Sequence, residues 1–336
     1  MQLAISTWTH HLNHLIYSYF YFCQNEKIKA VILKDSSIVS NGAVLNINGD
    51  KIFFDYSDDS LFLDKPEKFN LYFKRSLRKK DENSNVIPLN FNVPLAYKSF
   101  SLLMNLKSDL LLDKWSRIEV LKAFDIYGLA SKSSHCVLDI RRYPENVIDN
   151  GGKVLFHTRL WNPDNHPDED EKERRVLQND FRINACRIIK KNFKDASVGL
   201  FSDNLSQKLA PDLLLNPKES KKNNYLNRLK NYDIGIADDG LKNTPGWKIG
   251  EYLLFGKAVI TTPLDVVLNN FKEAIHYEKV SNRSAYLELP DKIHWLLANK
   301  KYMDMALANK EWSDQYLHPH CYIQRILSIV ENRNSY

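Results

Sequence analysis

The chain has 336 residues, 43% hydrophobic and 26% charged, an ordinary globular composition that favours two domains able to bury a sizeable core. The formal net charge of +6 suits anionic small ligands or an anionic surface, but so mild a balance does not imply nucleic acid. Basic residues gather in three clusters, interpreted as solvated faces: 74–80, 187–194 and 218–230.

The cysteines and the hydropathy favour a reducing, aqueous compartment. Cys23, Cys136, Cys186 and Cys321 lie far apart without CxxC or Cys/His spacing, which predicts neither a disulfide framework nor a zinc site. No window approaches the roughly 20 apolar residues that a membrane-spanning helix needs. We therefore expect a cytoplasmic protein, with any membrane association peripheral and at the inner face of the membrane.

The first 140 residues mix strand and helix signals. The turn pair Asn48-Gly49 inside an alternating stretch predicts a β-hairpin over 42–57. The other expected elements, in chain order, are a strand at 1–7, a helix at 11–25, strands at 28–35 and 68–77, and a helix at 115–128.

After a turn-rich linker at 139–152, strands and helices alternate. Strands are expected at 153–161, 197–203, 233–240 and 257–263, helices at 169–193, 223–232 and 245–256, and three further helices within 287–332. This alternation predicts a parallel sheet covered by helices on both faces. Ligands of such sheets bind beyond the carboxyl ends of the strands.

The stretch TPGWKIGE opens the last of those three helices. Thr244 fits the N-cap and Pro245 the first helical position. Gly246 removes a side chain where a ligand could approach the first turn. The free N–H groups there, the positive helix end and Lys248 together favour a phosphate.

Glu251 is the only acid on an otherwise apolar face of that helix, which it shares with Trp247 and Leu254. A buried carboxylate needs partners. A basic side chain would make it a structural ion pair, and two sugar hydroxyls would make it a ligand-binding group. The spacing leaves both alternatives open.

Residues 233–241 (DIGIADDGL) and 246–264 (GWKIGEYLLFGKAVITTPL) resemble the C-terminal, nucleotide-sugar-binding domain of GT-B glycosyltransferases, and 153–163 (KVLFHTRLWNP) resembles its first strand. The resemblance covers about 153–265. It implies an α/β fold of two Rossmann-like domains facing a cleft, with a C-terminal helix crossing back. It also implies that Glu251 binds the donor ribose, that Thr244, Gly246 and Lys248 face the donor phosphates, and that Arg159 neutralises the diphosphate.

The implied domains are an acceptor-binding domain at 1–148, a donor-binding domain at 149–316 and a returning helix at 317–336. One position departs from the family. Many retaining members carry a glutamate eight residues before the ribose-binding one, and here Asn243 stands there. A retaining mechanism is therefore not carried over to this chain.

Catalytic and acceptor-binding candidates lie elsewhere in the chain. His10 and His11 follow the first strand and could supply a general base, because an imidazole titrates near neutral pH. Asp239 is a second candidate, although Asp239-Gly240 is also an ordinary turn. Lys74 and Arg75 end a strand, where they could receive an anionic acceptor or simply be exposed. His10 and His14 have metal-ligand spacing without a third ligand nearby, so no metal is expected.

The expected function is transfer of a sugar from a nucleotide-activated donor to a hydroxyl of a glycan or lipid-linked glycan, in bacterial surface polysaccharide synthesis. No metal or other cofactor is required, because lysine, arginine and the helix end can stabilise the leaving phosphate. Nucleic acid is not an expected partner. The alternatives are a nucleotide-sugar epimerase of the same fold and a non-catalytic nucleotide- or glycan-binding module.

Overall fold

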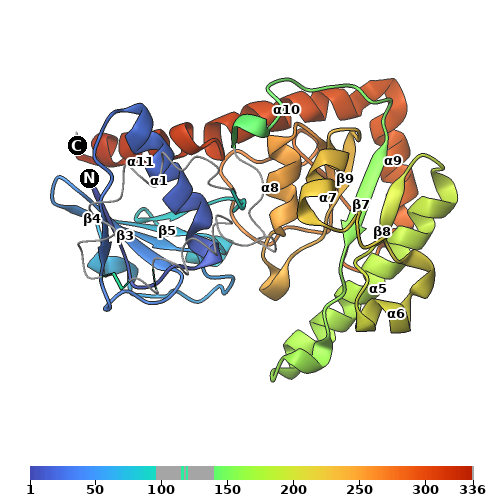
Figure 1. The fold of residues 1–336 in the computed structure, drawn as a ribbon, viewed down its shortest axis with the longest axis horizontal. Coiled ribbons are helices and arrows are strands. Elements are labelled where there is room, and N and C mark those ends of the chain that lie inside the picture. Colours follow the sequence, from blue (N-terminus) through green and yellow to red (C-terminus); the bar gives the residue numbers. More distant parts are fainter. Residues whose placement is uncertain (96–114, 117–118, 120–139, 335–336) are drawn as a thin grey trace. The chain divides into compact units, whose positions relative to one another are not determined.

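The computed structural model describes residues 1–95, 115–116, 119 and 140–334, and forms two compact units (Figure 1). The first unit comprises Met1–Tyr143, Asp265–Asn269 and Ser313–Tyr336, and the second comprises Pro144–Leu264 and Asn270–Trp312. The sequence-based boundaries were 148/149 and 316/317. Most of the helix expected at 115–128, and Cys136, lie outside the described residues.

The first unit contains a mixed sheet of six strands in the order β2-β1-β3-β4-β5-β6. Its strands are β1 (Gln2–Ile5), β2 (Ile32–Lys34), β3 (Gly42–Ile47), β4 (Asp50–Asp55), β5 (Leu71–Lys74) and β6 (Val86–Pro88). Strands β3 and β4 form the predicted antiparallel hairpin. Its two loop residues, Asn48 and Gly49, have positive φ angles of 50° and 97°, as the tightest hairpin loops require.

The strand directions bring three loops of the first unit to one edge of its sheet. Strand β4 runs parallel to β5, and β1 and β4 are both antiparallel to β3. The carboxyl ends of β1, β4 and β5 therefore lie along the same edge. The chain that follows each of them carries His10 and His11, Tyr56, and Arg75, respectively.

Two helices from opposite ends of the chain pack together in the first unit, α1 (Asn13–Asn25) and α11 (Pro319–Asn334). The Nε2 atom of His14 on α1 lies 2.9 Å from the carbonyl oxygen of Leu317, to which it donates. The hydroxyl of Tyr322 on α11 lies 2.5 Å from that of Tyr56. The C-terminal helix thus belongs to the first unit, as the predicted fold requires.

The second unit contains the predicted parallel sheet, with strand order β11-β10-β9-β7-β8 and every neighbouring pair parallel. The strands are β7 (Val154–Thr158), β8 (Ser197–Leu200), β9 (Ile234–Ile236), β10 (Ala258–Thr261) and β11 (Glu278–Lys279). All residues of β7, β9 and β10 are buried, as expected for a sheet covered on both faces. The α/β fold class is therefore confirmed.

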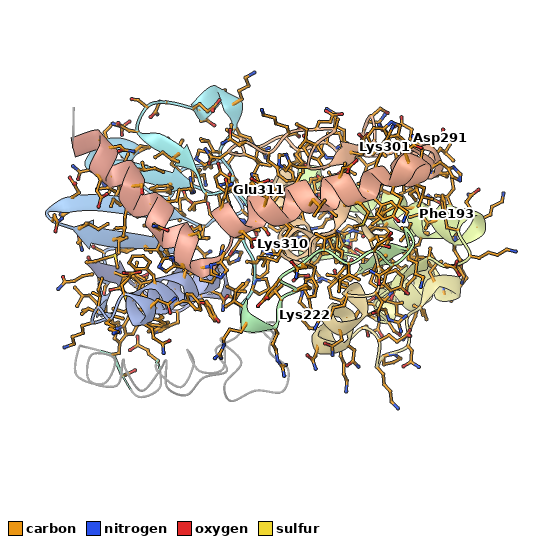
Figure 2. All side chains as sticks on the ribbon, turned by 90° about the horizontal axis from the view of Figure 1, so that it is seen from above. Phe193, Lys222, Asp291, Lys301, Lys310 and Glu311 are labelled. Carbon is orange, nitrogen blue, oxygen red and sulfur yellow. The ribbon has the colours of Figure 1, made fainter. Side chains whose placement is uncertain are left out.

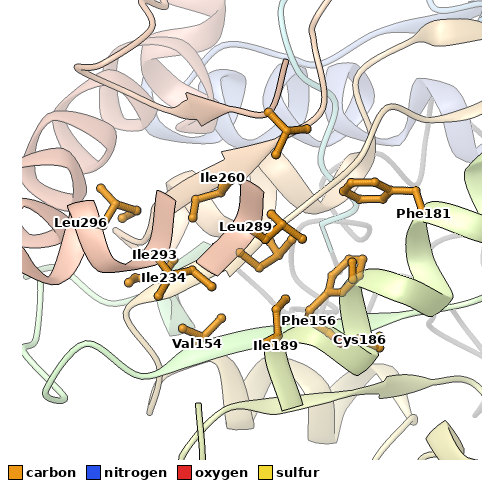
Figure 3. Close-up of a cluster of buried hydrophobic side chains, with 14 of the residues drawn as sticks. Val154, Phe156, Phe181, Cys186, Ile189, Ile234, Ile260, Leu289, Ile293 and Leu296 are labelled. Carbon is orange, nitrogen blue, oxygen red and sulfur yellow. Dashed lines mark hydrogen bonds between the residues drawn. The ribbon is translucent and has the colours of Figure 1, made fainter. Parts of the chain in front are cut away.

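Helices α5 (Glu169–Asn192) and α9 (Leu289–Leu297) cover one face of this sheet. Their apolar side chains, among them Phe181, Ile189 and Ile293, pack against Phe156 and Ile234 (Figure 3). The remaining helices of this region are α6 (Asn204–Leu209), α7 (Lys222–Leu229), α8 (Trp247–Leu254) and α10 (Lys301–Tyr316), the last of which carries Lys310 and Glu311 (Figure 2).

Helix α8 packs on the opposite face. Gly235 lies between Ile234 and Ile236 and therefore faces away from the cluster that includes them. A Cβ atom added to Gly235 would lie 2.5 Å from the ring of Tyr252 on α8. Gly235 is thus required by the close approach of α8, and the sheet is covered on both faces as predicted.

Candidate functional site

The candidate site lies at the carboxyl ends of β7 and β9, which are neighbours in the second sheet. The chain leaves β7 for α5 on one face and leaves β9 for α8 on the other. Loops that depart in opposite directions leave a crevice between them, where doubly wound sheets bind their ligands. The segments bordering this crevice contain five of the residues predicted from the sequence: Arg159, Asp239, Thr244, Gly246 and Lys248.

Asp239 is buried, and both of its carboxylate oxygens have partners. Oδ1 accepts a hydrogen bond from the Thr262 hydroxyl at 2.9 Å, and Oδ2 accepts one from Arg283 Nε at 2.8 Å. Burial and the neighbouring charge of Asp238 raise the pKa of Asp239, although Arg283 opposes the shift. These contacts join the loop after β9 to the end of β10, which favours a positioning role for Asp239 over that of a base.

Asp238 anchors the same loop to α5. Its Oδ2 accepts from Arg182 Nε at 2.7 Å and from Gln178 Nε2 at 2.9 Å. Arg182 also donates from Nη1 to the carbonyl oxygen of Arg159 at 2.6 Å. One buried guanidinium therefore connects the loops after β7 and β9, which fixes the two sides of the crevice.

Side chains fill the deepest part of this crevice. The hollow beside Asp238 and Asp239 measures about 10 Å³, the space of a single water molecule at most. A larger hollow, of about 480 Å³, lies toward the amino ends of the strands. Its lining residues are Lys153, Lys218, Glu219, Asn224, Asn227, Arg228, Asn231 and Tyr232. None of the sequence-predicted site residues lines that second hollow.

Helix α8 begins at Trp247 with Gly246 as its N-cap, so the prediction that Thr244 caps the helix is wrong. Residues 239 and 245 form an antiparallel bridge, which holds the chain extended up to Pro245. Thr244 instead donates its hydroxyl to the Leu241 carbonyl oxygen at 2.9 Å. A Cβ atom at Gly246 would lie 2.9 Å from the Asp238 carbonyl oxygen, so the close approach of backbone explains this glycine.

Lys248 lies in the first turn of α8 and reaches the end of β7. Its ammonium donates to the carbonyl oxygen of His157. Burial, reinforced by the positive charge of Arg182, lowers the pKa of Lys248 to about 7. A lysine tuned in this way gains a full positive charge when an anion approaches it.

Glu251 is fully buried on the next turn of α8. Its Oε1 accepts from the ammonium of Lys222 on α7, whose side chain is 28% exposed. Its Oε2 is shielded from solvent and has no hydrogen-bond partner in the described part of the chain. The structure is therefore compatible with both roles considered from the sequence. One oxygen forms an ion pair, and the other remains able to accept a hydrogen bond from a ligand.

Arg159 follows β7 and is exposed. Its guanidinium stacks over the ring of Trp161, with 3.8 Å between the guanidinium carbon and the ring centroid. Stacking on an indole orients the guanidinium while leaving its N–H edges for other partners. Arg159 is thus placed as a cation beside the carboxyl end of β7.

The first unit brings His10, His11 and Arg75 together. The rings of His10 and His11 lie 4.2 Å apart, and His11 Nδ1 lies 3.4 Å from Arg75 Nη1. Arg75 also forms an ion pair with Asp58. Burial lowers the pKa of His11 to about 4, so its imidazole is neutral at pH 7 and able to accept a proton.

Lys74 is fully buried and has protein partners for all three of its N–H donors. Its ammonium lies 3.1 Å from Asp55 Oδ2, 2.9 Å from the Ser57 hydroxyl and 2.6 Å from the Asp59 carbonyl oxygen. Of the two predicted acceptor-binding residues, Lys74 is thus occupied by protein partners, and Arg75 is also buried beside Asp58 and His11.

Sequence reasoning missed four side chains that shape the crevice: Gln178, Arg182, Lys222 and Arg283. Gln178 and Arg182 are four residues apart on α5, beside the apolar Phe181 and Ala185, and such a polar pair next to a core face was a usable signal. Lys222 belongs to the basic cluster 218–230, which was interpreted as a solvated face. No local sequence pattern marks Lys222 or Arg283 as a residue of the site.

No group of three His, Cys, Asp or Glu side chains is placed to hold a metal ion within residues 1–95 and 140–334. None of the helices described there is both long enough and apolar enough to cross a membrane.

No protein family model matches the chain, and neither does any curated protein sequence. Among solved structures, a glycosyltransferase from Rickettsia africae is 11% identical, over 95% of this chain and 80% of the other, with a TM-score of 0.44. The C-terminal domain of a group 1 glycosyl transferase from Francisella tularensis, LpcC, is 13% identical, over 53% of this chain and 97% of that domain, with a TM-score of 0.38.

A third structure, described as a UDP-N-acetylglucosamine 2-epimerase from Listeria monocytogenes, is 11% identical over 98% of this chain and 95% of its own, with a TM-score of 0.43. Solved structures similar to this chain therefore include glycosyltransferases, the group that the sequence resembles. At these scores the likeness carries no conclusion about activity, which has to come from the site itself.

Proposed function

We propose that the second unit binds a nucleotide-activated sugar at the carboxyl ends of β7 and β9, and that the chain transfers this sugar to a glycan hydroxyl. The observation that carries the proposal is Glu251, a fully buried carboxylate with one oxygen paired to Lys222 and the other without a partner among the described residues. Two adjacent ribose hydroxyls supply two donors to two carboxylate oxygens. The ribose would take the place of the Lys222 ammonium, which can turn to solvent.

The phosphates would lie one turn earlier on α8. Gly246 caps the helix without a side chain, so the first N–H groups and the positive end of the helix face the ligand. Lys248 lies in the same turn, and Arg159 follows the neighbouring strand. The diphosphate would draw the Lys248 ammonium from the His157 carbonyl oxygen and restore its full charge.

In the proposed reaction the bond from the anomeric carbon to the diphosphate breaks and a bond to the acceptor oxygen forms. Negative charge grows on the departing nucleoside diphosphate, where Lys248, Arg159 and the end of α8 would stabilise it. The proton of the acceptor hydroxyl passes to a base. His11 is proposed for this role, because its imidazole is neutral and the charge of Asp58 favours the imidazolium that forms.

His10, which is exposed beside His11, is the second candidate base. The cationic groups named above do the work that a divalent ion would otherwise do, so the proposal includes no metal or other cofactor. The acceptor would be a glycan or lipid-linked glycan, with surface polysaccharide synthesis as the setting. That setting rests on analogy with the family alone.

The first experiment compares thermal stabilisation by UDP, GDP and CMP. A nucleotide at 100 times its dissociation constant stabilises the folded protein by about 2.7 kcal/mol, which is readily measured. Stabilisation by one nucleotide over the others is expected. If none of the three raises the melting temperature, the donor site proposed here is wrong.

The second experiment separates transfer from its alternatives. The chain is incubated with the UDP-, GDP- or CMP-sugars that match the preferred nucleotide, and the products are followed by NMR. Release of free sugar and nucleotide is expected, because transferases slowly hydrolyse donors when no acceptor is present. Conversion of the donor to its epimer would indicate an epimerase, and binding without turnover would indicate a binding module.

A further inference from the structure

Arg325 on α11 is a partly buried cation without an anionic partner in the described part of the first unit. Its Nε and Nη2 atoms are shielded from solvent, and neither has a hydrogen-bond partner there. The groups that act on the charge of Arg325 are burial, which lowers its pKa, and three tyrosines. No carboxylate is among them. Shielding two donor atoms of a guanidinium from water without a counter-ion destabilises the fold, so their retention calls for an explanation.

The two unpaired atoms form one edge of the guanidinium. Nε–H and Nη2–H point in the same direction, which is the geometry that binds two oxygens of one carboxylate or phosphate side by side. The group also makes a cation–π contact, because its central carbon lies 5.1 Å from the ring centroid of Tyr316. This contact holds the group, while its bidentate edge has no partner in the described part of the chain.

Two tyrosine hydroxyls act electrostatically on Arg325 and supply a further donor. The hydroxyls of Tyr56 and Tyr322 are both buried and lie 2.5 Å apart, close enough for one hydrogen bond between them. Two hydroxyls have two hydrogens, and this bond uses one. No described residue accepts the second. Tyr322 is three residues before Arg325 on α11, so the two side chains share a face of the helix.

A second cation acts on the same place. Arg75 and Arg325 both act electrostatically on the Tyr56 hydroxyl. Tyr56 follows β4 and Arg75 follows β5, and these two strands are neighbours in the sheet. Asp58 balances Arg75 through their ion pair, so the cluster keeps a net positive charge of about one. These side chains therefore offer more hydrogen-bond donors than acceptors, and they carry one more positive charge than negative charge.

We propose that Arg325, the Tyr56–Tyr322 hydroxyl pair and Arg75 form a binding site for an oxyanion, either a phosphate monoester or the carboxylate of an acidic sugar. Arg325 retains partial exposure, so a rotation of its side chain brings the unpaired edge to an incoming anion. If the proposed transferase function holds, this oxyanion belongs to the acceptor, which is then an acidic or phosphorylated glycan. The anion site itself does not depend on that function.

The test measures melting temperatures in inorganic phosphate, in D-glucuronate and in chloride at equal ionic strength, with glucose as the neutral control. Phosphate or glucuronate is expected to stabilise the wild type beyond chloride, and which of them does so identifies the oxyanion. Arg325→Gln should lose this response. Arg333→Gln, an exposed arginine on the same helix, is the matched control and should keep it.

Removal of the unpaired charge gives an independent readout. Arg325→Met should melt at least about 2 °C above the wild type in anion-free buffer, because the cost of burying the guanidinium disappears. Tyr322→Phe keeps the ring and removes a hydroxyl, so it should weaken phosphate binding severalfold without unfolding the helix. A lower melting temperature for Arg325→Met, or an equal anion response in the wild type and Arg325→Gln, would overturn the proposal.

Thermal stabilisation by nucleotides distinguishes a failure of the anion site from a failure of the donor site. UDP, GDP and CMP stabilisation should be the same in Arg325→Gln and in the wild type. If nucleotides stabilised neither protein, the donor site would be contradicted, and the proposal of the anion site would be unaffected.

Discussion

Glu251→Gln is the most informative perturbation of the donor site, because it changes charge while keeping shape. A hydroxyl that donates to a carboxylate contributes about 1.5–3 kcal/mol, and an amide retains only one neutral acceptor. Loss of the charge and of one acceptor should therefore cost about 2–3 kcal/mol of nucleotide affinity. That corresponds to a dissociation constant about 30- to 150-fold higher.

The same substitution should change folding stability little. Lys222, 28% exposed, would lose its partner and turn to water, so Glu251→Gln should lower the free energy of unfolding by about 1 kcal/mol or less. Lys222→Ala should be far worse, since it leaves a buried carboxylate without a cation and costs about 3–5 kcal/mol. The double variant should recover to the stability of Glu251→Gln.

Isothermal titration with the preferred nucleotide and urea unfolding measure the two quantities. Glu278→Gln is the matched control, because Glu278 is another buried carboxylate of the second unit, with Lys292 Nζ 2.8 Å from its Oε2. It should leave nucleotide affinity unchanged. Equal affinity in Glu251→Gln and the wild type would refute the ribose role and leave Glu251 as a structural ion pair.

Three other outcomes follow from the structure. The pKa of Lys248 is about 7 in the free protein, so nucleotide binding at pH 8 should be accompanied by the uptake of close to one proton. Calorimetry in buffers of different ionisation enthalpy measures this uptake, and Lys248→Met should abolish it. His11→Gln should abolish sugar transfer while leaving nucleotide affinity intact, and full activity in the variant would exclude His11 as the base. Because the pKa of His11 is about 4, the wild-type transfer rate should not fall through protonation of His11 between pH 8 and pH 6. Gly235→Ala should lower the urea midpoint strongly through the Tyr252 clash, and an unchanged midpoint would contradict the packing of α8.

Local patterns predicted much of the fold. The Asn48-Gly49 pair gave the hairpin because only residues that tolerate positive φ fit a two-residue loop. The apolar runs between residues 153 and 263 gave the parallel sheet because strands buried on both faces need continuous apolar sequence. Lys74 was less predictable, since its burial depends on Asp55 of the adjacent strand.

The interior of the candidate site depends on contacts between distant parts of the chain. Arg182 binds Asp238 from 56 residues away, and no local spacing announces such a pair. The cap of α8 was misassigned for a similar reason. Thr244 has the right chemistry, but the bridge between residues 239 and 245 delays the helix by two residues. Glu251 was found from sequence because a lone acid on an apolar face is a local signal.

The first unit is assembled from three separate stretches of chain, and α11 lies in the last of them, after the second unit in the sequence. Domains of nascent proteins generally fold in order from the N-terminus. Here that order is reversed in part, because α1 waits for α11 while the second unit is complete once residue 312 has emerged. A stalled or truncated product lacking α11 would therefore hold a folded second unit and expose the face of α1 that α11 covers, which makes it a substrate for chaperones and proteases.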